Sequence, residues 1–358
     1  MRKRFASIDI SDSLVCALVV EIDNQGRLEI TGAASVSSRS VVKGVVADQG
    51  GLSDTIKKAI EKAKGPSGQR IFSCTINISG PRLDFRTSHG IAPLHESSRR
   101  VKRSDISRAI KVGRTIGLAP DMEVVNVIPQ TFLLDGEGII KNPVGMYGVR
   151  LECDIFMVIA PRTQVANLVE SVNGAGLSVD SICFTALATA FGVCDWRGNM
   201  HPGNAESASG FVIVDAKRDL IDVAYFKDGY IRAADAVTSS GDDTIRIDLL
   251  TRKITDRLAH LNMPSDYELL LSGKDLLRDD LLNGLETSLG KSPRIATLFE
   301  ANGDSEILTN PIYTTALGLI RYRIESAKRT PFIPQLHLQR PLVTRLTERV
   351  TTFLEDYF

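Results

Sequence analysis

Long hydrophobic runs are absent from this sequence. No apolar stretch approaches the ~18 residues that a membrane-spanning helix needs. The basic residues 1–4 lead into a segment interrupted by Asp9 and by the polar turn at residues 11–13, so the apolar middle of a secretion signal is missing. Both absences favour a soluble or peripheral protein.

An excess of charge of one sign is also absent. Lys+Arg and Asp+Glu both number 43, and the formal net charge at pH 7 is +0. A protein that holds nucleic acid through its phosphates is expected to have a basic balance or a basic stripe. The basic run at residues 99–103 stands alone, and we interpret it as a solvated segment leading into a helix. Nucleic acid is therefore not an expected partner.

Cysteine and histidine are scarce and scattered. The 5 cysteines and 5 histidines show neither the spacing of a metal site nor that of a disulfide framework. Most cysteines lie in apolar surroundings, as expected for small buried side chains in a reducing cytoplasm. We therefore expect no metal site and no disulfide.

What is present is a chain of 358 residues with 43% hydrophobic content, enough for two lobes. Apolar segments separated by the polar turns 11–13 and 24–26 predict opening strands at 5–10, 14–22 and 28–36, then an amphipathic helix at 51–64 with Ser53 near its cap. A similar order returns later, with strands at 210–214, 220–226 and 230–236, a helix at 243–262 and a strand at 269–271. This repeated order predicts an α/β protein whose two lobes share one plan.

Residues 82–160 interrupt the first lobe with strand-like segments and a helix near 104–113 that Ser104 is expected to cap. The segment 141–148 reads as a rigid connection between strands, with Lys141 and Arg150 as cationic residues near its ends. On the residues alone, a tight loop without a ligand is the favoured interpretation.

The block that contains this loop resembles the bacterial cell-division protein family FtsA, whose members are actin-like membrane adaptors. It comprises residues 127–130 (VIPQ), 140–145 (IKNPVG) and 148–150 (GVR), and the segments 176–180, 187–190 and 310–320 also resemble the family. The resemblance implies an actin-like (ribonuclease-H-like) α/β fold of two lobes with an inserted α+β subdomain. The family-motif residues of the loop are Lys141, Asn142, Pro143, Gly145, Gly148 and Arg150.

The resemblance also implies the domain boundaries. The ranges are 1–81 and 161–200 for the first lobe, 82–160 for the insertion, 208–325 for the second lobe, 326–340 for a tether and 341–358 for an amphipathic helix. Residues 197–209 are a candidate linker between the lobes. Only one helix is expected between Ala236 and Leu269, so the resemblance implies that the second lobe lacks most of the extra subdomain that the family carries there.

In this family, glycine-rich hairpins present backbone N–H groups to the phosphates of ATP, because a Cβ would crowd the phosphate. Here those elements are degenerate, and the two acids that would face a metal ion, Asp9 and Asp215, persist. The candidate nucleotide-binding residues are Asp9, Ser11, Asp12, Ser13, Asp215, Lys217, Arg218, Ser272 and Gly273.

Two interpretations of these elements stay open. In the first, the hairpins have lost nucleotide binding and the fold serves as a scaffold. In the second, Lys217 and Arg218 bind phosphate with side-chain charge, although Asp12 and Asp219 would each repel it at a cost on the order of 1 kcal/mol. We favour loss, with no catalytic residue and no enzymatic activity; ATP and Mg²⁺ are expected as cofactors only if the pocket still works.

The last residues, 341–358, have apolar side chains at three- and four-residue spacing after Pro341. Such a helix can pack on its own protein, pair with a partner or lie in a membrane interface, and the resemblance favours the membrane. The expected membrane-binding residues are Leu342, Val343, Leu346, Val350, Phe353, Leu354, Tyr357 and Phe358.

The resemblance implies a scaffold of the division ring at the division site, peripheral on the cytoplasmic face of the inner membrane. Its implied partners are the tubulin-like ring protein FtsZ, downstream division proteins and further copies of the chain. Direct FtsZ binding is the least secure of these, because the missing subdomain is where the family receives the FtsZ tail. The alternatives are an active actin-like ATPase and an adaptor of a pilus or secretion machine.

Overall fold

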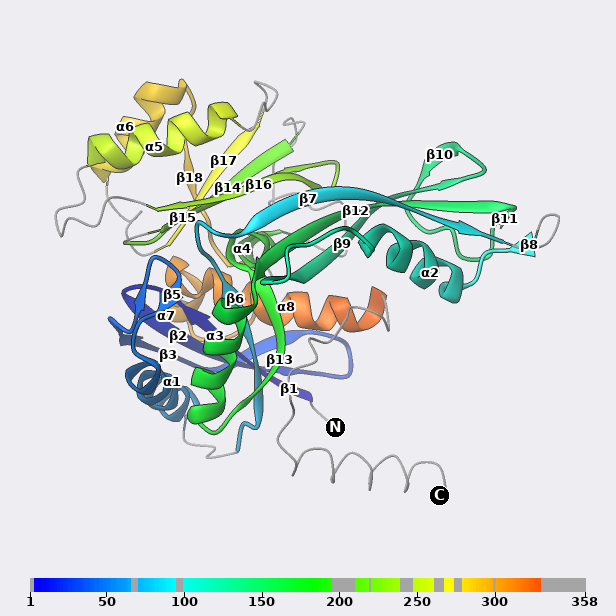
Figure 1. Cartoon of the computed structure of the whole chain (residues 1–358). Helices are drawn as coiled ribbons and strands as arrows, with labels where there is room; N and C mark the ends of the chain where they lie inside the picture. Colours follow the sequence, from blue (N-terminus) through cyan, green and yellow to red (C-terminus); the bar gives the residue numbers. More distant parts are fainter. Residues whose placement is uncertain are drawn as a thin grey trace, which may run out of the picture.

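A computed structural model describes residues 3–65, 70–94, 99–194, 210–218, 220–238, 247–260, 267–273, 279–298 and 301–329. Figure 1 shows two α/β lobes, one above the other, and a further sheet with one helix that extends to the right of them. The helices α4 (Thr185–Val193) and α8 (Thr314–Arg329) lie where the lobes meet.

The first lobe is built on a five-stranded sheet in the order β13-β6-β1-β2-β3. The opening strands form the antiparallel meander that the sequence predicted, and β6 and β13 add to it in parallel. The strands are β1 (Lys3–Ile10), β2 (Leu14–Ile22), β3 (Leu28–Ser37), β6 (Ser73–Ile78) and β13 (Ser178–Phe184), with the short pair β4 (Val41–Val42) and β5 (Val45–Val46) beside the sheet.

Helices α1 (Gln49–Ala63) and α3 (Arg162–Gly174) pack together on this sheet. The predicted start of α1 was wrong, because the helix begins at Gln49 and its N-cap is Asp48, whose side chain accepts a hydrogen bond from the Gly51 amide. Ser53 instead lies inside the helix and donates its hydroxyl to the carbonyl of Ser171 at 2.9 Å. This side chain therefore joins the two helices.

The insertion has a four-stranded antiparallel sheet in the order β10-β9-β12-β7. Its elements are β7 (Asp84–Pro93), β8 (Arg99–Arg100), α2 (Arg103–Arg114), β9 (Met122–Leu134), β10 (Glu137–Ile140), β11 (Tyr147–Gly148) and β12 (Arg150–Pro161). Ser104 does not cap α2: the N-cap is Lys102, whose amide donates to the Asp105 carboxylate at 2.9 Å. The basic run at residues 99–103 was expected to be solvated, but its Arg99 side chain forms an ion pair with Asp105 at 2.7 Å.

The second lobe repeats the plan with the strand order β16-β15-β14-β17-β18. Its elements are β14 (Gly210–Ala216), β15 (Leu220–Lys227), β16 (Tyr230–Thr238), α5 (Ile247–His260), β17 (Glu268–Ser272), α6 (Asp279–Leu289) and β18 (Arg294–Ile295). The following α7 (Ser305–Leu308) and the 3-10 helix η2 (Pro311–Tyr313) pack against β2 and β3 of the first lobe, so the second-lobe range expected at 208–325 extends too far. Between β16 and β17 the described residues contain the single helix α5, as the sequence predicted.

Helices α4 and α8 cross in close contact. A Cβ added at Gly318 would lie 1.7 Å from the Ala188 carbonyl oxygen, so only glycine permits this approach. Helix α8 continues to Arg329, so the residues from 326 to 329 are helical and do not belong to the tether expected at 326–340. Among the described residues no helix has the length and apolar character to span a bilayer.

Candidate functional site

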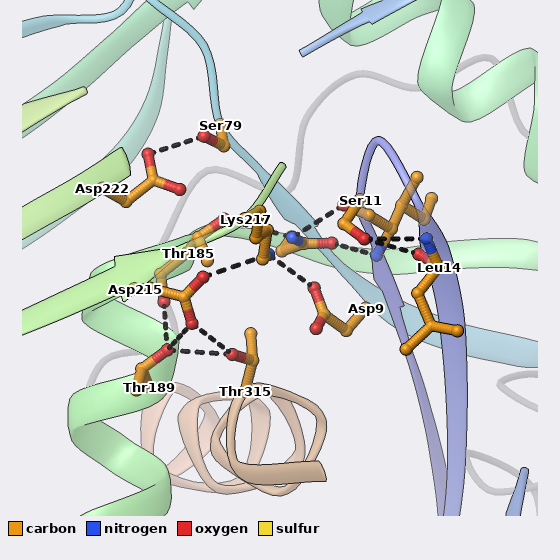
Figure 2. Close-up of polar contacts among 12 residues, drawn as sticks. Asp9, Ser11, Leu14, Ser79, Thr185, Thr189, Asp215, Lys217, Asp222 and Thr315 are labelled. Carbon is orange, nitrogen blue, oxygen red and sulfur yellow. Dashed lines mark hydrogen bonds and ion pairs between the residues drawn. The ribbon is translucent and has the colours of Figure 1, made fainter. Parts of the chain in front are cut away.

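The candidate site lies between the lobes, where the carboxyl ends of β1 and β14 face each other. Asp9 comes from β1 of the first lobe and Asp215 from β14 of the second. Lys217 follows two residues after Asp215, and strand alternation puts residues two apart on one face. Figure 2 shows the Lys217 side chain reaching between the two carboxylates.

The ammonium group of Lys217 forms buried ion pairs with both carboxylates. Its Nζ lies 3.1 Å from Asp9 Oδ1 and 3.5 Å from Asp215 Oδ1, and only 6% of the lysine side chain is exposed. Burial alone would lower the pKa of Lys217, but the charges of Asp215, Asp9 and Asp222 outweigh it and raise the pKa. The lysine therefore stays charged between the lobes.

A third buried acid, Asp222, lies directly across the hairpin from Asp215 in the β14–β15 register. Its Oδ1 accepts a hydrogen bond from the hydroxyl of Ser79, which follows β6 in the first lobe, at 2.6 Å. Burial raises the pKa of Asp222 to about 8, although the charge of Lys217 and the bond from Ser79 oppose the rise. This contact is a second polar connection between the lobes.

The two central helices hold Asp215 in place. Its Oδ2 accepts hydrogen bonds from the hydroxyl of Thr189 in α4 at 3.3 Å and from that of Thr315 in α8 at 3.2 Å. The two threonine hydroxyls are 2.9 Å apart, and all three side chains are buried. The carboxylate is thus fixed on one side by helices and on the other by the lysine.

The first hairpin is closed by its own polar groups. The Ser11 amide donates to the Leu14 carbonyl at 2.9 Å, and the Ser11 hydroxyl donates to the same carbonyl at 2.8 Å. The Ile10 amide donates to the Asn77 side chain at 2.7 Å. These hydrogen bonds, several of which Figure 2 draws, engage the hairpin within the protein.

Gly273, one of the candidate nucleotide-binding residues, has a packing role. Gly273 has a φ of +107°, and a Cβ there would lie 2.2 Å from the Ala216 carbonyl oxygen. Its glycine is therefore required for the close approach of β17 to β14. Ser272 beside it is buried.

Most of the predicted nucleotide residues do come together around one small cavity. Its lining includes Asp9, Ser11, Ser13, Asp215, Lys217, Ser272 and Gly273. Asp12 is buried next to this lining and Arg218 is half-buried at the turn that follows β14, and neither is among the residues that line the cavity.

The residues present do not fit ATP with its magnesium ion. Among the described residues the cavity is small, with a volume of about 20 Å³. The ammonium of Lys217 lies between the two acids that a metal ion would face, and its charge is engaged by them. Among the described residues no group of three His, Cys, Asp or Glu side chains is arranged to hold a metal.

The family-motif loop lies far from this cavity, at the outer end of the insertion in Figure 1. Its Gly145 amide donates to the Val101 carbonyl at 2.9 Å, and β11 pairs with β8. A Cβ at Gly148 would lie 2.5 Å from the Leu134 side chain. The loop thus packs on the segment that leads into α2. This packing explains why glycine is needed at position 148.

Sequence reasoning missed several polar residues of the site: Asn77, Ser79, Thr189, Asp222 and Thr315. Asp222 carried a signal, since it is an acid inside an otherwise apolar strand. The expected linker at 197–209 and the expected membrane-binding residues at 341–358 lie outside the described residues.

Comparison with known proteins gives the family. A family model described as the SHS2 domain inserted in FtsA matches residues 80–159. The cell division protein FtsA of Borreliella burgdorferi is 30% identical over 228 residues, 64% of this chain and 53% of that protein. The FtsA of Pseudomonas aeruginosa is 31% identical over 240 residues, 67% of this chain and 55% of that protein. The chain belongs to the FtsA family.

This FtsA-family chain spans about half the length of the curated relatives it matches. A solved structure titled as a PilM–PilN type IV pilus biogenesis complex aligns with a TM-score of 0.65 at 18% identity, covering 90% of this chain and 99% of that one. That likeness concerns the fold alone. The FtsA-family chain has the actin-like α/β fold that its motifs implied.

Proposed function

We propose that this chain is a cell-division protein that acts as a peripheral scaffold of the division ring on the cytoplasmic face of the inner membrane. The observation that carries the proposal is the similarity to proteins named cell division protein FtsA over about two thirds of the chain. The match of residues 80–159 to a domain described as inserted in FtsA supports it independently.

The proposed partners are division proteins. They are the ring protein FtsZ, downstream division proteins that contact the insertion, further copies of the chain, and the membrane through residues 341–358. The resemblance implies that the FtsZ tail binds a subdomain between β16 and β17, and the described part of that segment contains one helix. Direct FtsZ binding is therefore proposed separately from the scaffold role. A scaffold recruited through other division proteins would act at the same place without it.

The proposed scaffold works without ATP hydrolysis. In support, Lys217 is paired with Asp9 and Asp215, the two acids that would face a metal ion, and the cavity between them is small, about 20 Å³ among the described residues. The hydrogen bonds of the Ser11 hairpin also stay within the protein. An active ATPase would need these contacts to open before it could bind a nucleotide.

A second candidate is an adaptor of a type IV pilus or secretion machine. It is favoured by the alignment with the PilM–PilN complex, which covers nearly all of both chains. The relatives at 30% and 31% identity and the inserted-domain match favour division instead. The two candidates differ in where the protein gathers in the cell.

Localisation of a fluorescent fusion in its own organism tests the proposal. We expect a band at midcell that appears as the cell divides and depends on residues 80–159, which contain the matched domain. A fusion in which residues 80–159 are removed is the control, and it is expected to lose the band. Polar or patchy foci of the intact fusion would instead support the pilus adaptor and refute the division role.

A further inference from the structure

Three acidic side chains are buried at the boundary between the two lobes. Asp9 reaches it from the first lobe, and Asp215 and Asp222 reach it from the second, with exposed fractions of 6%, 0% and 0%. Two ionised carboxylates brought together in such surroundings repel each other and lose their hydration. Closure of the lobes therefore needs a buried positive charge at this point.

Lys217 supplies that charge from within the chain. Its Nζ is 3.1 Å from Asp9 Oδ1, which belongs to the opposite lobe, and 3.5 Å from Asp215 Oδ1, which belongs to its own. The attraction thus acts directly across the boundary. A lysine that merely filled space would not need to direct its ammonium at both carboxylates.

The lysine is also held on a rigid support. Its amide donates to the Leu220 carbonyl at 2.8 Å and closes the β14–β15 turn. Asp215 is fixed by the hydroxyls of Thr189 and Thr315. Because the partners are already positioned, little side-chain entropy remains to be lost when the ion pairs form.

We propose that the ammonium group of Lys217 is a built-in cation that holds the two lobes closed. Closure by this group, which we call the Lys217 clamp, requires neither a bound nucleotide nor a metal ion. This inference deepens the proposed scaffold role, because it gives the reason why the scaffold works without ATP. The contact between Ser79 and Asp222 assists closure at a second point.

A double-mutant cycle on the purified full chain tests the clamp. Lys217→Met removes the charge and keeps a long side chain, Asp9→Asn removes the opposing acid, and the double variant removes both. Breaking one partner of a buried pair is costly, so Lys217→Met is expected to lower Tm by about 5 °C or more. Exposed Lys58→Met, in α1, is the matched control and should leave Tm unchanged.

The double variant is expected to recover part of that loss, because one of the two buried acids, Asp9, is then uncharged, whereas Asp215 stays without its ammonium partner. Small-angle X-ray scattering should give a larger radius of gyration for Lys217→Met than for the wild type and the control. Wild-type Tm and radius of gyration should not change when magnesium and ATP are added. The scattering and ATP measurements on the wild type need no variant to fold.

Three results would overturn the clamp. They are a Lys217→Met protein as stable and compact as the wild type, a double variant that gains nothing over Lys217→Met, and a wild type that magnesium and ATP stabilise or compact. If Lys217→Met does not fold, the double variant must fold better, or the proposal fails. These readouts use purified protein, so a missing midcell band would refute the division role and leave the clamp standing.

Discussion

Neutralising Asp222 should change how the stability of the protein depends on pH. Burial raises the pKa of this carboxyl from 3.8 to about 8 in the folded protein. The groups that face it are Ser79, Lys217, Asp215 and Asp9. The folded state therefore holds a proton that the unfolded chain releases, and Asp222→Asn removes that difference.

The sign and size of the effect follow from linkage. A folded-state pKa above the unfolded value means that stability is greatest below about pH 4 and is lost as pH rises toward about 8. One such group contributes up to about 1.4 kcal/mol per pH unit, or about 3 kcal/mol between pH 5 and pH 7. At roughly 2 °C per kcal/mol for a chain of this size, this corresponds to a fall in Tm of about 5 °C.

Thermal melts at pH 5, 6 and 7 measure the slope for the wild type, for Asp222→Asn and for a surface control, Asp54→Asn, at an exposed position of α1. Slopes are compared because the new amide places an extra donor in a buried site and shifts the whole curve. We expect the wild-type slope to be more negative than that of Asp222→Asn, and the control to follow the wild type. Equal slopes for all three proteins would refute the assignment of a bound proton to Asp222 in the folded state.

Two further predictions concern the insertion and the tail. A Cβ at Gly90 would lie 2.0 Å from the Ala109 carbonyl oxygen, so Gly90→Ala should cost about 1–3 kcal/mol in urea unfolding, whereas Gly117→Ala, with nothing within 4 Å, should be neutral. Equal effects would refute the close contact of β7 with α2. Liposome flotation should be lost in Phe353→Glu/Phe358→Glu and kept in Thr344→Glu/Thr352→Glu, which adds equal charge to the same segment. Equal flotation of both variants would remove the tail from the membrane proposal.

Local patterns predicted the elements of this fold well. Short apolar runs bounded by polar turns gave β1, β2 and β3, of which β2 is buried on both faces and β3 alternates between buried and exposed positions. Spacing of three and four gave the buried side of α1 with Leu52, Ile56 and Ile60. The helix start was missed because Asp48, the residue that satisfies the Gly51 amide, precedes two glycines that look unlike a helix.

The interlobe contacts could not be predicted in the same way. Lys217 was expected either at a decayed hairpin or on a phosphate, whereas its Nζ contacts Asp9, which is 208 residues away in the chain. Strand alternation could place Lys217 on the same face as Asp215, but only the packing of the two lobes brings Asp9 to meet them. A pattern within one segment carries no information about a partner in another lobe.

The charged side chains around the cavity explain why a nucleotide would bind poorly there. Asp9, Asp215 and Lys217 are all at least nine-tenths buried, and a buried acid persists only when it is paired, hydrogen-bonded or protonated. Asp9 is paired, Asp215 is paired and hydrogen-bonded, and Asp222 accepts from Ser79 and has a raised pKa. Each acid thus has at least one contact with groups of the chain itself, although Asp215 Oδ1 and Asp222 Oδ2 are buried without a hydrogen-bond partner in the described part of the chain. A ligand phosphate would add negative charge beside these acids, so nucleotide binding would have to break the Lys217 pairs first.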